Sequence, residues 1–218
     1  MTQEHTDHGL AWIGHHADDA RGGVSGMRGS ISLTAIRGAD PVDFLVRMGA
    51  DQEVLARGVL YKDIAAHWSP QEYKDWQCMF GTSGEWTFLL EDSLCATWYL
   101  DWIEEVGDAM PRLGEELVCV TLNQHQAPAK LLYSPGDGEV WSMGIGEEGL
   151  LDYPGREDPT GKVAALDEAL GRAGVVWHGE ALLPRVFRTV GEHLGLGLPR
   201  QEIEAGLLPA AGLPDPTQ

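Results

Sequence analysis

The chain has 218 residues, 43% of them hydrophobic, with 34 acidic residues against 15 basic ones and a formal net charge of −19. This length and apolar content suffice for one globular domain with a sizeable core that needs neither disulfides nor metal. The charge argues against partners that are nucleic acids or anionic membranes, because both repel an acidic protein. The acidic residues are scattered, which favours a soluble acidic protein over the alternative, a DNA mimic or a decoy for a basic partner.

The three cysteines, Cys78, Cys95 and Cys119, lie in apolar surroundings and outside metal-ligand spacing of one another. Reduced, buried thiols of this kind are typical of a cytosolic protein. The first eight residues do not have the pattern of a signal peptide, and no apolar run approaches the roughly 20 residues of a membrane helix. We therefore expect a cytoplasmic protein.

We expect residues 1–30 to be loosely structured, residues 31–208 to form a single α+β domain, and residues 209–218 to be a disordered tail. The N-terminal segment contains four histidines near three aspartates, which would suit a metal. Its glycines favour a mobile polar segment instead, so we expect neither a metal nor a cofactor. These residues are His5, His8, His15 and His16, with Asp7, Asp18 and Asp19.

The stretch with the clearest start and stop signals is a strand followed by a turn and a helix. Residues 31–37 alternate apolar and small or polar side chains, which predicts a half-buried strand. Asp40 is placed as an N-cap and Pro41 as the first helical residue. The helix is predicted over Pro41–Met48, with Gly49 ending it.

Two apolar runs, residues 76–80 and 86–91, flank the turn-forming residues 81–84 and predict a β-hairpin with a four-residue loop. The second run is apolar on both faces and is interpreted as the central strand of a covered sheet. Glu85 and Glu91 lie about 20 Å apart on an extended chain, so we interpret them as solubility residues at the strand ends.

Aromatic residues gather in two places. Trp68, Tyr73 and Trp76 belong to a connector that either covers the core or contributes to a binding surface. Trp98 and Trp102 lie one turn apart on a helix predicted over residues 94–106, where they either pack in the core or line a ligand pocket. We favour the core in both places and keep all five residues as binding candidates.

Three further strands are predicted over residues 116–123, 129–134 and 139–144, with Asp137-Gly138 as a hairpin turn. Helices follow from Thr160 to about Arg172, from about Leu182 to Leu194, and over residues 200–205. The sequence therefore predicts an α+β fold: a roughly six-stranded, mainly antiparallel sheet covered by helices, with a helical C-terminal region.

Several of these motifs resemble those of a family of uncharacterised proteins common in actinobacteria. They are Arg37-Gly38-x-Asp40-Pro41, Leu45-x-x-Met48-Gly49-Ala50 and Trp86-x-Phe88-Leu89-Leu90-Glu91. The likeness covers about residues 10–208, and Met48 stands where the usual pattern has leucine. The family is a domain of unknown function, so the resemblance implies a fold and no catalytic residues.

The chain contains no phosphate loop, dinucleotide fingerprint, nucleophile elbow or His-Glu-x-x-His motif. His125, after a predicted strand, is the weak candidate for a general base, and we favour a solvent-facing loop histidine over that role. We therefore expect an acidic binding or interaction protein, of immunity or accessory type, whose partner is a protein or a small molecule. The alternative is a small-molecule cyclase, isomerase or lyase with an apolar, Trp-lined pocket.

Overall fold

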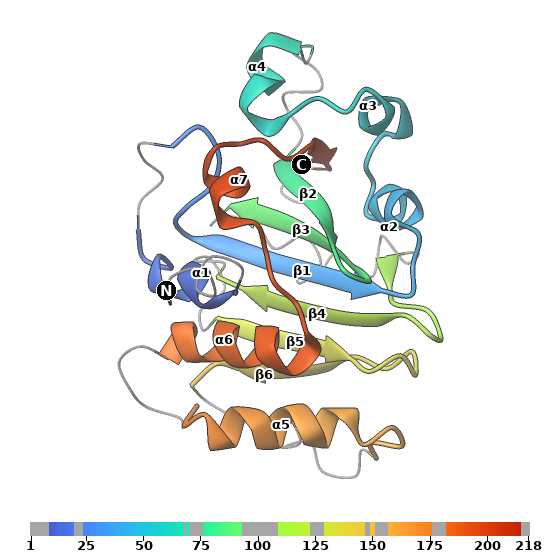
Figure 1. Ribbon diagram of the computed structural model, residues 1–218. Coiled ribbons are helices and arrows are strands. Elements are labelled where there is room, and N and C mark those ends of the chain that lie inside the picture. The colour runs from blue at the N-terminus through green and yellow to red at the C-terminus, as the bar shows by residue number, and fades with distance from the viewer. Residues whose placement is uncertain are drawn as a thin grey trace.

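A computed structural model describes residues 9–19, 24–67, 69, 76–92, 109–122, 129–146, 149–150, 157–175 and 182–214. These residues form one seven-stranded, fully antiparallel sheet in the order β6-β5-β4-β1-β3-β2-β7, together with helices (Figure 1). The strands are β1 (Ile31–Arg37), β2 (Trp76–Ser83), β3 (Trp86–Asp92), β4 (Glu116–Thr121), β5 (Lys130–Ser134), β6 (Trp141–Gly144) and β7 (Ala210–Leu213). The predicted α+β class with an antiparallel sheet is confirmed.

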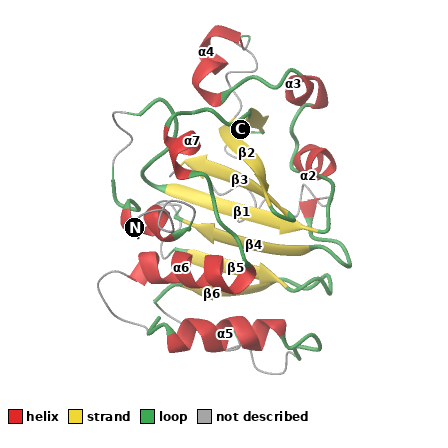
Figure 2. Cartoon of the chain, viewed as in Figure 1, coloured by secondary structure: helices red, strands yellow, loops and turns green. Residues whose placement is uncertain are grey.

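The helices are spread around this sheet (Figure 2). They are α1 (Ala11–His15), α2 (Pro41–Arg47), α3 (Gln52–Ala56), the 3-10 turn η1 (Tyr61–Asp63), α4 (Ile64–His67), α5 (Lys162–Arg172), α6 (Leu182–Leu194) and α7 (Arg200–Glu204). The predicted cap of α2 is confirmed, because the Asp40 carboxylate accepts from the amides of Val42 and Asp43 at 3.0 Å each. Gly49 has a φ of 93°, as the residue after a helix end requires.

Both faces of the sheet are covered, which explains why its strands are apolar on both sides. Leu33 and Ala35 of β1 belong to the core under α1, α5 and α6. Because side chains along a strand point alternately to opposite faces of the sheet, Ile36 lies in a second core on the other face. Phe44 and Leu45 of α2 fill that second core. Successive side chains of the same strand therefore enter different cores.

The hairpin between β2 and β3 corrects two sequence predictions. The predicted loop over residues 81–84 is wrong, since β2 continues to Ser83 and the turn is Gly84-Glu85. Gly81 is needed inside the strand, because a Cβ there would lie 2.7 Å from the Phe88 ring. The middle of the sheet is β1, with β3 beside it, so residues 86–91 form an interior strand and not the central one.

The chain ends also differ from expectation. The tail predicted over residues 209–218 is wrong for Ala210–Leu213, which are buried and pair with β2. Residues 9–19 and 24–30 are not loose, since α1 packs on α6 so closely that a Cβ on Gly14 would lie 2.4 Å from the Pro184 nitrogen. Glu91 is buried rather than a solubility residue, whereas Glu85 is exposed.

Candidate functional site

A polar cleft of about 350 Å³ opens at the end of the sheet where β1 ends and β4 begins. It contains two cations, two carboxylates and three glycines that have positive φ angles. A Cβ on Gly114 would meet nothing within 4 Å and one on Gly136 nothing closer than 3.9 Å, so the main chain there is open to a ligand, whereas a Cβ on Gly38 would meet the Gly114 carbonyl oxygen. The lining residues are Arg37, Gly38, Glu85, Gly114, Glu116, Pro135, Gly136 and Lys162.

Glu116 is the centre of the cleft, and its side chain is only 5% exposed. Arg37 donates from Nε to Glu116 Oε2 at 2.8 Å, and its Nη2 donates to the same oxygen. Lys162 on α5 donates to that oxygen at 3.1 Å and to the Pro135 carbonyl at 2.9 Å. The Tyr133 hydroxyl donates to the other carboxylate oxygen. One carboxylate thus joins β1, β4, β5 and α5.

The pKa values in this cluster move away from neutrality. Burial raises the pKa of Glu116, but hydrogen bonds from Tyr133, Arg37 and Lys162 outweigh it and bring the pKa below its usual value. Burial raises the pKa of Tyr133, and the Glu116 carboxylate raises it further. At neutral pH Glu116 therefore stays an anion and Tyr133 stays a donor, a state suited to holding groups in place.

The hydrogen-bonded cluster around Glu116 has a net positive charge, whereas the cleft lining as a whole, which includes Glu85, is neutral. Two cations, Arg37 and Lys162, against the anion Glu116 sum to +1, and their side chains are 34% and 46% exposed. Arg37 also lies over the Trp86 ring, 4.9 Å from its centroid, which fixes the guanidinium. Glu85 lines the same cleft from the β2–β3 turn, but it is exposed and screened by water.

A second ion pair lies beside the cleft and fixes the segment that precedes β4. Arg47 of α2 donates to both carboxylate oxygens of Glu115, at 2.9 and 3.0 Å, and both side chains are buried. Glu115 also accepts from the amide of Arg112, and Arg47 donates to the Met110 carbonyl. Residues 110–115 are therefore held rigidly against α2.

Four exposed apolar side chains lie on these two joined segments. They are Val42, Val46, Met110 and Leu113, which together we call the apolar patch. Val42 and Val46 lie one turn apart on α2, and the Asp43–Arg112 ion pair of 3.3 Å links α2 to the second segment. Leu113 is 84% exposed and directly precedes Gly114 of the cleft. The patch and the cleft therefore adjoin.

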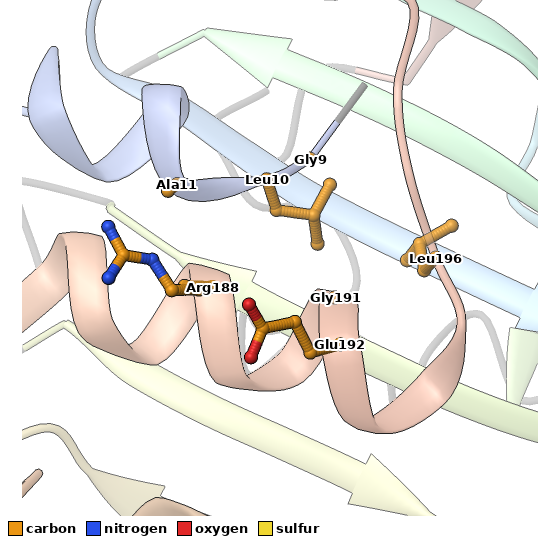
Figure 3. A pocket seen from close by; sticks show the side chains of 7 residues that line it. All are labelled: Gly9, Leu10, Ala11, Arg188, Gly191, Glu192 and Leu196. Carbon is orange, nitrogen blue, oxygen red and sulfur yellow. The ribbon is translucent and has the colours of Figure 1, made fainter. Parts of the chain in front are cut away.

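A third feature is a groove of about 470 Å³ between α1 and α6 (Figure 3). Figure 3 shows Arg188 and Glu192 on α6 facing the main chain of Gly9–Ala11, with Leu196 at one end. Both charged side chains are exposed to solvent. Among the described residues that line it, this groove has neither a buried carboxylate like that of the cleft nor converging cations.

Among the residues predicted as a site from sequence, Trp76 is the one that the described part of the chain contains, and it does not line the cleft or belong to the patch. Trp76 is half-buried on β2, opposite Leu213 of β7, and packs against the second core. The other candidates lie outside the described residues and stay predictions: Trp68, Tyr73, Trp98, Trp102 and His125. Cys95 also lies outside them, whereas Cys78 and Cys119 are buried, as predicted.

The residues that sequence reasoning missed are Arg37, Glu116, Tyr133 and Lys162. The signal available in the sequence was one charged residue at the end of each of two mostly uncharged strands. Arg37 is the last residue of β1, and Glu116 is the first residue of β4. Nothing in the local sequence indicates that these ends meet. Only the pairing of Arg37 with Glu116 in the β1–β4 register brings them together.

Within the described ranges, no group of three or more His, Cys, Asp and Glu side chains is placed to hold a metal ion. The helices of the described chain are all too short or too polar to span a membrane. Comparison of the chain with models of known protein families, with curated protein sequences and with solved structures found no match.

Proposed function

We propose that this chain is a cytosolic interaction protein of immunity or accessory type, which binds a partner protein through the apolar patch and the adjoining cleft. One observation carries this proposal. Five large apolar side chains are exposed among the described residues, and four of them lie on α2 or on residues 110–115, the segment that Arg47 and Asp43 of α2 contact. Apolar side chains gathered in one place, beside polar groups, are a feature of interaction sites.

The rigidity of the surface supports the same proposal. The buried Arg47–Glu115 pair and the contact from Arg47 to Met110 hold both halves of the patch in one arrangement. A surface ordered before binding loses less conformational entropy when the partner docks. The exposed Leu113 then serves as an anchor that a partner pocket desolvates.

Charge complementarity favours a heterologous partner with basic residues. Asp40 and Asp43 are exposed at the start of α2, beside Val42, where Asp40 caps the helix and Asp43 pairs with Arg47 at 3.1 Å and with Arg112 at 3.3 Å. Two copies of a chain with a net charge of −19 repel each other, so a second copy is disfavoured. A partner that offers an apolar pocket for Leu113 and basic side chains toward α2 fits both features.

The ionisable groups favour binding over acid–base catalysis. A general acid or base works best with a pKa near the working pH. The pKa of Glu116 is lowered and that of Tyr133 is raised, so both pKa values move further away from neutral pH. The alternative of a Trp-lined enzyme pocket depends on Trp98, Trp102 and His125, which lie outside the described residues, and it stays a prediction.

The test compares photo-crosslinking in lysate of the native host for the wild type, Leu113→Asp and the matched control Leu207→Asp. Leu207 is the fifth exposed apolar residue and lies outside the patch, at 43% exposure. We expect one protein species that crosslinks to the wild type and to Leu207→Asp. The crosslink to this species should be absent with Leu113→Asp. Equal crosslinking by all three would contradict the proposal. If the purified chain sediments as a dimer and the Leu113→Asp variant sediments as a monomer, the partner is a second copy of this chain and not a different protein.

A further inference from the structure

We infer that the cleft beside the apolar patch receives a carboxylate group of the partner, from an Asp or Glu side chain or from a chain terminus. This inference rests on the proposed function, because it concerns the same surface. It assigns a chemical class of ligand to Arg37 and Lys162. Acidic residues on α2 and cations in the cleft would together also fix the orientation of the partner.

The donor count supports an additional acceptor. A guanidinium has five N–H donors and an ammonium has three, eight in total. Arg37 directs two of its donors at Glu116, and Lys162 directs one at Glu116 and one at the Pro135 carbonyl. Three donors of Arg37 and one of Lys162 therefore remain for a ligand, and both side chains are partly exposed. A carboxylate can accept several of them at once.

The shape and charge of the cleft fit a small anion. Gly114 and Gly136 line it without side chains and with open space where a Cβ would lie, so that a ligand group can approach the main chain there. Within the partly exposed cluster, Arg37 and Lys162 exceed Glu116 by one positive charge, which favours a negatively charged ligand there. Glu85 opposes this preference from the rim, and its exposure limits the repulsion by solvent screening.

Two substitutions with opposite expected effects test the site. Lys162→Gln removes one cation, whereas Glu85→Gln removes the opposing charge and leaves the cluster around Glu116 untouched. Lys62→Gln is the matched control, since Lys62 is exposed and outside the cleft. The probe is sodium acetate, titrated at constant ionic strength against sodium chloride, with the amide NMR signals of Gly38, Gly114 and Gly136 as reporters.

We expect saturable shifts of these glycine signals with a dissociation constant on the order of 10 mM. Lys162→Gln should weaken binding about threefold and Glu85→Gln should tighten it by a similar factor, while Lys62→Gln changes nothing. Shifts no larger than those in chloride, or shifts that are indifferent to both cleft variants, would overturn the inference. Binding of inorganic phosphate without binding of acetate would overturn the carboxylate assignment.

The outcome is separable from that of the proposed function. If acetate does not bind but Leu113→Asp still abolishes crosslinking, the partner docks on the patch and only the inference about the cleft fails. If acetate binds but Leu113→Asp has no effect on crosslinking, the cleft is an anion site and the proposed patch fails.

Discussion

Arg37 and Lys162 donate hydrogen bonds to the same atom, Oε2 of Glu116, although one ends the middle strand of the sheet and the other begins α5. The shared acceptor connects the sheet to the helix that covers it. The Tyr133 hydroxyl occupies the second oxygen of the carboxylate. The same cluster therefore has two consequences, one for stability and one for what the cleft can bind.

Glu116→Gln should lower the free energy of unfolding by about 2 kcal/mol, because it removes the charge that Arg37 and Lys162 share in a nearly buried position. The partial exposure of both cations keeps the loss below that of a fully buried pair. Urea unfolding at pH 7 measures it. Glu85→Gln, on the exposed rim of the cleft, should change the value by less than about 0.5 kcal/mol. Equal effects of the two substitutions would contradict the central position of Glu116.

The stability that Glu116 provides should depend on pH in a defined direction. Its pKa in the folded protein is below the usual value of 4.5, so its full contribution is present above that value. As the pH falls, the unfolded chain takes up the proton first, and the contribution disappears as the pH passes through the lowered pKa. The difference in unfolding free energy between wild type and Glu116→Gln should be constant from pH 6 to 8 and shrink below about pH 4.5. A difference that grows on acidification would contradict this assignment.

Local signals in the sequence predicted the elements better than their arrangement. Asp40, Pro41 and Gly49 predicted α2 within a residue of its observed end, because caps depend only on neighbouring residues. The position of β1 in the middle of the sheet depends on pairing with both β3 and β4, which no local pattern encodes. Gly81 was misinterpreted as a turn residue because its reason for being glycine is the Phe88 ring on the next strand.

The candidate site was harder to predict for the same physical reason. Arg37, Glu116, Tyr133 and Lys162 come from four elements, and each stands in an unremarkable local context. The aromatic residues that attracted attention in the sequence include Trp76, which packs at the second core beside β7. Large aromatic residues are conspicuous in any sequence, whereas a polar site assembled at strand ends is visible only after the strands are in register.

Gly38→Ala should destabilise the fold by more than Gly58→Ala. Both glycines have positive φ, 87° and 59°, so either substitution costs about 1 kcal/mol in backbone strain. At Gly38 the added Cβ would also lie 2.5 Å from the Gly114 carbonyl oxygen, whereas at Gly58 it would meet no atom within 4 Å. We expect an additional loss of about 1–3 kcal/mol at Gly38. Thermal unfolding measures the two variants, and equal losses would show that the close approach of β1 to Gly114 is absent.

Cys119 should resist alkylation in the folded protein. Burial raises the pKa of its thiol to about 12, so the reactive thiolate is scarce at pH 8. Iodoacetamide at pH 8 followed by peptide mass spectrometry should leave Cys119 unmodified in the native protein and modify it in urea. Modification of Cys119 at comparable rates in both conditions would contradict its burial between β1 and β5.

A chain that ends at Pro209 should lose both stability and solubility. It lacks β7, and so removes the pairs from Trp76↔Leu213 to Met79↔Ala210 and uncovers the edge of β2. Loss of the buried Ala211 and Leu213 side chains from the second core costs about 3 kcal/mol, and the open edge favours pairing between molecules. Urea unfolding and light scattering should show a lower midpoint and concentration-dependent aggregation. A chain that ends at Pro214 keeps all of β7 and is the matched control. If both truncated chains unfold at the same urea concentration and stay monomeric, β7 does not complete the sheet in solution.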